Sequence, residues 1–212
     1  MGLREQKKEQ TRRLITETAW RLFADRGFDR VSVAEVAREA QVAETTVFNY
    51  FRTKEDLFYS GLEGFGADLV AAVRDRAAGE SALVAFRRFV LSAQGMLARI
   101  AEGDAEALVR ARSVMKMVAD SPRLRAREHE ALAHITDTLA DLLAAETGAP
   151  AGDLTARVVA NALVGVHRTL IEYVRSRVLA DDEVLRLADD VRTHGEAAFA
   201  LLETGLRDYA TR

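Results

Sequence analysis

Apolar residues recur along most of this chain at intervals of three and four positions, the spacing that brings side chains to one face of an α-helix. Runs of β-branched residues are few, whereas Ala, Leu, Arg and Glu, which favour helices, are abundant. The pattern predicts an all-α fold in which an N-terminal three-helix domain is joined to a larger domain of about six helices. Long helices are expected over residues 8–25, 54–78, 82–101, 105–118, 123–146, 153–179 and 181–209.

Residues 32–57 fit two short helices joined by a tight turn and followed by the start of another helix, which is a helix-turn-helix unit. Counted from Val33, the small residue Ala37 takes the fifth of the unit's positions, where the two helices cross too closely for a longer side chain. The inward positions are all apolar or aromatic: Val36, Ala40, Val42, Val47 and Tyr50. The alternative interpretation is a helical hairpin that binds nothing.

Capping residues stand at the predicted helix boundaries. Ser32 and Glu35 have the spacing of a capping box, in which each side chain bonds a free amide at the helix start. Thr53 and Asp56 repeat this arrangement more weakly before the next helix. Gln41 begins the turn, where a positive φ is needed, and its Cβ makes that conformation cost about 1 kcal/mol.

Two segments on either side of the predicted first turn carry a family resemblance. Residues 11–27 (TRRLITETAWRLFADRG), Phe28 and residues 31–58 (VSVAEVAREAQVAETTVFNYFRTKEDLF) resemble the N-terminal DNA-binding domain of the tetracycline-repressor (TetR) family. Beyond about the first quarter of the chain, only the length and the all-helical pattern are similar. The resemblance implies a homodimeric transcription regulator, usually a repressor, that leaves its DNA operator when a small molecule enters the C-terminal domain.

Three positions depart from the family pattern. Gln41 and Ala43 stand where glycine and a capping serine or threonine are common. Phe48 stands where many members have a tyrosine that hydrogen-bonds a phosphate, so that contact is absent here. These differences concern the turn geometry and one backbone contact.

The second helix of the unit, expected over residues 44–51, is the element that would read DNA. Val47 and Phe51 are four positions apart and are expected to face inward, with Phe48 beside them. The outer face then presents Thr45, Thr46, Asn49 and Tyr50.

Base contacts are expected from Thr45, Thr46 and Asn49, because Asn can pair with adenine and a Thr methyl can contact the thymine methyl. The resemblance implies phosphate contacts for Tyr50 and Lys54, with Arg52 as a further candidate. An ordinary solvated position is the alternative for each of these residues.

The expected division is a helix-turn-helix DNA-binding domain over residues 1–53 and a helical ligand-binding and dimerisation domain over residues 54–212, which begins with a connecting helix at 54–78. The last two predicted helices carry small and apolar residues at coiled-coil spacing. These are Ala160, Val164, His167, Ile171, Val174 and Val178, then Ala188, Val191, Gly195, Ala198, Leu202 and Gly205. The pattern favours a homodimer whose four-helix bundle is formed by these helices, and a purely intrachain core is the alternative.

A ligand pocket in the second domain would be lined mainly by apolar and aromatic groups with a few polar ones. The candidates are Phe65, Phe86, Phe89, Met96, Met115 and His129, with Asn161 and His167 as polar groups. The alternative is that these residues are ordinary core or surface positions at helical spacing.

Enzyme motifs are missing from the sequence. It contains no phosphate-binding GxxxxGK loop, no GxSxG nucleophile and no cysteine, and its four histidines are scattered. We therefore expect no enzyme activity, no cofactor and no metal ion. No apolar run is long enough to span a membrane, and the opening residues lack the apolar core of a signal peptide, so a cytoplasmic location is expected.

The net charge of −3 does not by itself indicate nucleic-acid binding. Only the first thirteen residues are clearly basic, with Arg4, Lys7, Lys8, Arg12 and Arg13 against Glu5 and Glu9. This segment fits either a tail that lies along phosphates or in a minor groove, or a solvated, disordered leader.

The sequence thus favours a homodimeric, sequence-specific DNA-binding regulator, a repressor released from a palindromic operator by a small apolar or amphipathic ligand. One alternative is a DNA-binding dimer without an effector, which acts as a constitutive or architectural regulator. Another is an all-helical enzyme or oligomerisation module.

Overall fold

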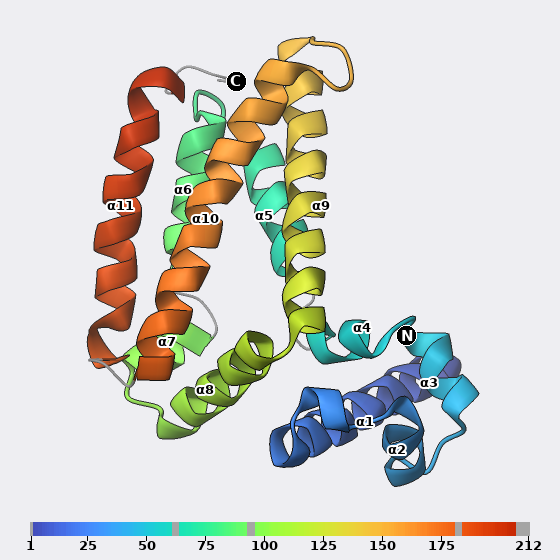
Figure 1. Ribbon diagram of the computed structural model, residues 1–212. Helices are drawn as coiled ribbons and strands as arrows, with labels where there is room; N and C mark the ends of the chain where they lie inside the picture. The colour runs from blue at the N-terminus through green and yellow to red at the C-terminus, as the bar shows by residue number, and fades with distance from the viewer. Residues whose placement is uncertain (1, 61–63, 93–95, 181–183, 207–212) are drawn as a thin grey trace. The chain divides into compact units, whose positions relative to one another are not determined.

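A computed structural model describes residues 2–60, 64–92, 96–180 and 184–206 of this protein (Figure 1). These residues contain helices and no strand, which confirms the all-α fold class. The helices are α1 (Leu3–Arg26), η1 (Phe28–Arg30), α2 (Val33–Glu39), α3 (Glu44–Tyr50), α4 (Lys54–Tyr59), α5 (Phe65–Arg74), α6 (Ala82–Leu91), α7 (Met96–Ala101), α8 (Ala105–Asp120), α9 (Pro122–Thr147), α10 (Leu154–Ala180), η2 (Val184–Arg186) and α11 (Leu187–Leu206).

Two helices that the sequence predicts as continuous are each divided in two. The helix expected over residues 54–78 appears as α4 and α5, and Gly64 before α5 has φ 114°, a conformation that residues with a Cβ rarely adopt. The helix expected over residues 82–101 appears as α6 and α7, and α6 ends at Ser92, which is extended with ψ 117°. The described part of the larger domain therefore has eight α-helices, α4 to α11, where about six were expected.

The chain packs into two compact units. The first comprises residues 1–63 together with 116–127, and the second comprises residues 64–115 together with 128–212. The end of α8 and the start of α9 therefore belong to the N-terminal unit. The packing into units does not show which residues bind DNA or a ligand, so the functional boundary between residues 53 and 54 stays a prediction.

Aromatic side chains form the centre of the first unit. The Phe58 ring of α4 lies 4.7 Å from that of Trp20 in α1 and 5.5 Å from that of Phe28, measured between centroids. Ile15 and Phe23 of α1 are fully buried beside them. Burying one such aromatic side chain contributes roughly 1.5–3 kcal/mol, so this cluster fixes α1 against α4.

Three polar contacts hold the α8–α9 junction within the first unit. The Ser121 hydroxyl donates to the Asp29 carboxylate at 3.0 Å, and the Tyr59 hydroxyl donates to the Leu124 carbonyl at 3.0 Å. Arg127 Nε donates to Asp56 Oδ1 at 2.9 Å. All three contacts join residues far apart in the sequence, so only the folded unit brings them together.

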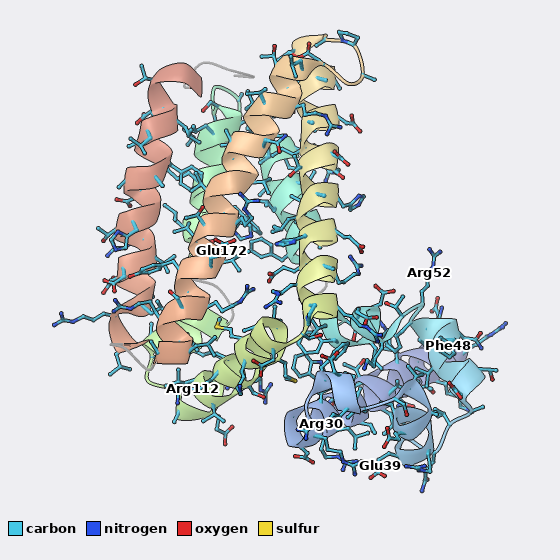
Figure 2. The ribbon with its side chains drawn as sticks, in the orientation of Figure 1. Arg30, Glu39, Phe48, Arg52, Arg112 and Glu172 are labelled. Atoms are coloured by element: carbon cyan, nitrogen blue, oxygen red, sulfur yellow. The ribbon has the colours of Figure 1, made fainter. Side chains whose placement is uncertain are left out.

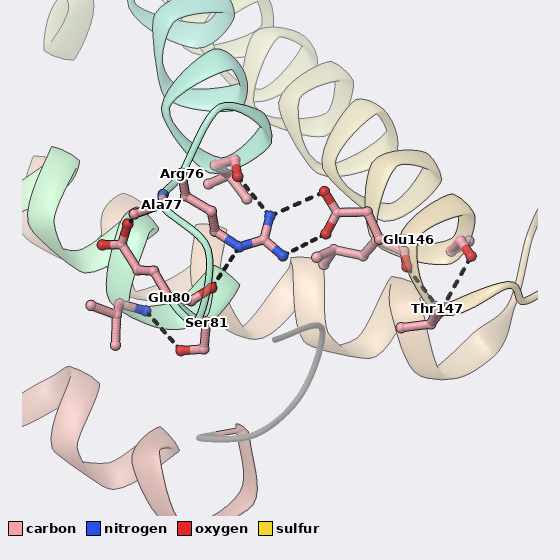
Figure 3. A network of polar contacts seen from close by, with 10 residues as sticks. Arg76, Ala77, Glu80, Ser81, Glu146 and Thr147 are labelled. Carbon is pink, nitrogen blue, oxygen red and sulfur yellow. Dashed lines mark hydrogen bonds and ion pairs between the residues drawn. The ribbon is translucent and has the colours of Figure 1, made fainter. Parts of the chain in front are cut away.

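The second unit has two apolar clusters, and α10 contributes to both of them. Glycine allows close packing at α11, because a Cβ at Gly195 would overlap the Leu91 side chain of α6. A buried ion pair joins the loop after α5 to the end of α9. The Arg76 guanidinium, whose side chain is 0% exposed, donates to both Glu146 carboxylate oxygens at 3.0 and 2.6 Å (Figure 3).

The small and apolar seam predicted on the last two helices lies inside this unit. Ala160, Val164, Val174 and Val178 of α10 are buried in the two clusters, and Val191 and Gly195 of α11 are buried as well. Six of the twelve positions predicted as an association surface are therefore intrachain core, whereas His167, Ile171, Ala188, Ala198 and Leu202 are half-buried. Gly205 lies outside the residues whose side chains are described.

Candidate nucleic-acid interface

The start of α2 is capped as the sequence predicts. The Glu35 backbone N–H donates to Ser32 Oγ at 3.2 Å, and the Ser32 backbone N–H donates to Glu35 Oε2 at 2.8 Å. The Ser32 backbone N–H, together with the Ser32 hydroxyl, holds the pKa of Glu35 below its ordinary value. This reciprocal bonding fixes the residue at which α2 begins.

The turn between α2 and α3 has the conformation expected from its sequence position. Gln41 has φ 55° and is the one residue other than glycine with positive φ in the described part of the chain. The Val42 backbone N–H donates to the Ala37 carbonyl at 2.9 Å and closes the turn. The packing of α2 against α3 thus offsets the cost of about 1 kcal/mol that the left-handed backbone conformation of Gln41 carries.

The inward face of α3 is formed by Val47, 1% exposed, and by Phe51, the residue that ends the helix and is 3% exposed. Thr45 and Asn49 are exposed, whereas Thr46 is half-buried. Tyr50 is also half-buried, with its ring 6.2 Å from that of Phe51. Of the three residues expected to contact bases, Thr45 and Asn49 are therefore the ones presented fully to solvent.

Phe48 does not lie beside the inward residues, and that expectation was wrong. Its side chain is 48% exposed, and both it and Arg52 extend outward from the ribbon (Figure 2). Positions 48 and 49 lie three and four residues after position 45, so these three side chains share one face of α3, whereas Arg52 follows the extended Phe51 beyond the end of the helix. This spacing was the signal that could have placed Phe48 with Thr45 and Asn49.

Lys54, expected to contact a phosphate, has its ammonium group engaged within the first unit. Nζ donates to the carbonyls of Phe28 and Val31 at 2.9 and 3.0 Å and lies 4.1 Å from the centroid of the Phe28 ring. Partial burial lowers its pKa. The side chain therefore ties the start of α4 to the segment between α1 and α2, a role that only the fold reveals.

Comparison with known sequences decides the family. Residues 15–60 match the family described as "Bacterial regulatory proteins, tetR family", and residues 90–207, more than half of the chain, match the "MftR C-terminal domain". The chain belongs to the TetR family. It is a DNA-binding transcriptional regulator, and the relatives that it matches are regulators rather than enzymes.

Individual relatives of this TetR-family regulator agree over most of its length. The MftR regulator of mycofactocin biosynthesis from Mycobacterium tuberculosis is 27% identical over 84% of this chain and 86% of its own. The regulator TcmR from Streptomyces glaucescens is 27% identical over 72% of this chain and 67% of its own. The structure of SmeT in complex with triclosan superposes with a TM-score of 0.54 at 14% identity, over 89% of this chain and 91% of SmeT, and shows the shared fold.

The residues expected to line a ligand pocket in this TetR-family regulator fall into separate groups. Phe65 of α5 stacks on His167 of α10, with centroids 4.9 Å apart, and lies 5.3 Å from the ring of Phe89. Phe86 is fully buried in the core, and Met115 packs against the second apolar cluster. The Met96 side chain lies outside the residues whose side chains are described.

Two open grooves mark the surface of the second unit. One, of about 270 Å³, lies between α9 and α10 and is lined by His129, Asn161 and Arg168 among others. The other, of about 500 Å³, lies between α6 and α11 and is lined by Arg87, Arg88, Leu91, Glu196 and Ala200. The fold thus brings His129 and Asn161 together, but not with the Phe65, Phe89 and His167 cluster. Among the described helices, none has the length and apolar content that crossing a bilayer requires.

The burial of His167 makes stability depend on pH. Burial lowers its pKa to about 4, so below pH ~6.5 the unfolded chain takes up a proton that the folded chain does not. Stability is therefore lost as the pH falls from about 6.5 towards 4. Between pH 7 and 4.5 we expect the free energy of unfolding to fall by about 2–3 kcal/mol more in the wild type than in His167→Gln.

Urea denaturation at the two pH values measures this difference. His134→Gln, which removes an exposed histidine from α9, is the matched control and should keep the pH dependence of the wild type. An equal loss of stability in wild type and His167→Gln would show that His167 is not kept neutral by burial.

Proposed function

We propose that this TetR-family regulator is a homodimeric repressor that binds a palindromic operator and is released by a small apolar or amphipathic ligand. The observation that carries the proposal is the outer face of α3, on which Thr45, Phe48 and Asn49 are exposed on a helix fixed by Val47 and Phe51, with Arg52 exposed just beyond the end of the helix. Amide, hydroxyl and apolar groups together are the set that reads base edges in a major groove.

The faces that α10 and α11 turn to solvent support the dimer. Leu154 and Val158 of α10 are 73% and 58% exposed, and Leu201 of α11 is 84% exposed. Small exposed residues, Ala197 and Ala200, lie near Leu201 on α11. Exposed apolar side chains on two adjacent helices favour an isologous contact with a second copy, through the faces opposite the buried seam.

The aromatic cluster of Phe65, Phe89 and His167 supports the ligand. It combines two rings with an imidazole, and Phe65 remains 42% exposed although it lies beside buried groups. SmeT, which shares the fold, has been solved with triclosan, a small molecule. A ligand that prefers the form unable to bind DNA would lower operator affinity by the same factor by which DNA lowers ligand affinity.

The effector-free regulator is the alternative function. It is favoured by the two grooves, which are open to solvent rather than enclosed. Operator titrations with and without candidate apolar compounds separate the two functions, because only the ligand-responsive form changes its apparent affinity. We include in this proposal the division of the chain into a DNA-binding domain over residues 1–53 and a ligand-binding and dimerisation domain over residues 54–212.

Substituting Asn49 tests directly whether the outer face of α3 contacts bases. With duplexes that differ at single positions of the half-site, Asn49→Ala should lose about 1–3 kcal/mol of discrimination at one step in each half-site. Arg52→Ala should instead weaken binding to every duplex alike and reduce the salt slope by about 1. Gel-shift titrations at several salt concentrations measure both quantities. Indistinguishable behaviour of the two variants would contradict the assignment of Asn49 to bases and Arg52 to phosphates.

A further inference from the structure

The face of α1 that packs into the first unit changes its chemistry along the helix. Ile15, Thr18 and Leu22 on this face are buried. Continued towards the N-terminus with the same spacing of three and four residues, the face passes Thr11, which is half-buried, and then reaches Lys8 and Arg4, which are exposed together with Lys7. The inward face of α1 thus turns basic where the helix extends past the packed core.

The basic end of α1 extends from the part of the helix that packs near the end of α3. The Arg12 guanidinium carbon lies 5.8 Å from the centroid of the Phe51 ring, and Phe51 is the residue that ends α3. In Figure 1 the N-terminal end of α1 lies at the α3 end of the unit. Arg4 is eight residues before Arg12, which places it roughly 12 Å further along the helix axis at about 1.5 Å per residue.

Two carboxylates of α1 bond to groups other than Arg4, Lys7 and Lys8. Glu5 accepts a hydrogen bond from the Gly2 backbone N–H at 3.0 Å, and Arg13, on the outer side of the helix, pairs with Glu17 at 2.6 Å. Within the described residues, Arg4, Lys7 and Lys8 have no ion-pair partner in the chain. Three exposed cations that form no ion pair within the described residues match a line of phosphates.

We propose that Arg4, Lys7 and Lys8 bind the phosphates that flank the half-site contacted by α3. The inference rests on the proposed operator binding and extends the DNA interface to a helix outside the helix-turn-helix unit. The contacts carry no base information, because phosphates are the same in every sequence. They raise affinity for operator and for unrelated DNA by the same factor.

The test is the salt dependence of binding to a palindromic duplex that the wild-type protein selects from a randomised library. The triple variant Arg4→Gln, Lys7→Gln and Lys8→Gln should reduce the slope of log K against log salt by about 0.9 for each phosphate that the variant no longer neutralises. Its preference for the selected duplex over a scrambled one should stay as in the wild type. The control triple Arg74→Gln, Arg110→Gln and Arg192→Gln removes the same charge at exposed positions of the second unit and should keep the wild-type slope.

Duplex length gives a second readout. A duplex cut at the outer edges of the half-sites lacks the flanking phosphates, so on it the wild type should bind no more tightly than the triple variant. An unchanged slope in the triple variant, or an affinity gap that persists on the short duplex, overturns the proposal. If the wild type itself selects no sequence from the library, the operator function fails instead, and the two failures are thereby distinguished. Circular dichroism checks that the triple variant retains its helix content.

Discussion

Arg76→Ala is expected to lower the free energy of unfolding by about 3–5 kcal/mol. The guanidinium donates to both oxygens of Glu146, to the Val73 carbonyl at 2.7 Å and to the Glu80 carbonyl at 2.9 Å. Because Glu146 is itself only 11% exposed, alanine would leave a carboxylate in a poorly solvated position without this counter-charge. Urea denaturation of the two proteins at neutral pH measures the difference.

A matched control separates this buried pair from an ordinary ion pair nearby. Arg88 pairs with Glu80 at 3.1 Å, but its side chain is 59% exposed, so Arg88→Ala should cost no more than about 1 kcal/mol. Replacing both partners, with Arg76→Met and Glu146→Leu, should recover much of the loss, because no charge is then left buried. Equal effects of Arg76→Ala and Arg88→Ala would contradict the role assigned to burial.

Charges placed on the exposed faces of α10 and α11 are expected to reduce operator affinity by about 100-fold or more. The double variant Val158→Glu and Leu201→Glu puts like charges where the proposed two-fold contact brings copies together. A monomer binds each half-site independently. It therefore loses the gain in affinity that linking two binding sites gives, which is about 10²–10⁴-fold. Light scattering gives the mass, and gel-shift titration gives the affinity.

Val109→Glu on α8 is the control for this variant. Val109 is 68% exposed in the same unit but lies outside the proposed contact, so the variant should remain dimeric and bind the operator as the wild type does. A double variant that stays dimeric would place the contact elsewhere. A monomer with unchanged operator affinity would show that dimerisation does not support DNA binding.

Local chemistry made the helix-turn-helix unit predictable. The Ser32 cap, the positive φ of Gln41 and the inward Val47 follow from neighbours within a few residues, and the structure confirms each of them. The contacts of Lys54 could not be predicted from its neighbours, because its carbonyl partners at Phe28 and Val31 precede it by more than twenty residues. No local pattern marks such a contact.

Periodicity was less informative for the second unit. It identified one stripe on α10 and one on α11 correctly as close-packing positions, but not the partner against which each stripe packs. Six of the twelve stripe positions are buried within the chain, and the pattern gave no sign of the exposed Leu154, Val158 and Leu201. The break at Gly64 was also missed, although three glycines at 61, 64 and 66 weaken any helix there.

The membership of residues 116–127 in the first unit has a consequence for biosynthesis. While the ribosome is still adding α5 to α7, the segment already made, which runs from α1 to α4, lacks Ser121, Leu124 and Arg127, the residues that bond Asp29, Tyr59 and Asp56. The nascent DNA-binding domain therefore lacks these three contacts until the chain has been synthesised beyond residue 127. Fragments excised near residue 60 should likewise lose amide protons to solvent exchange faster around Tyr59 than the intact protein does.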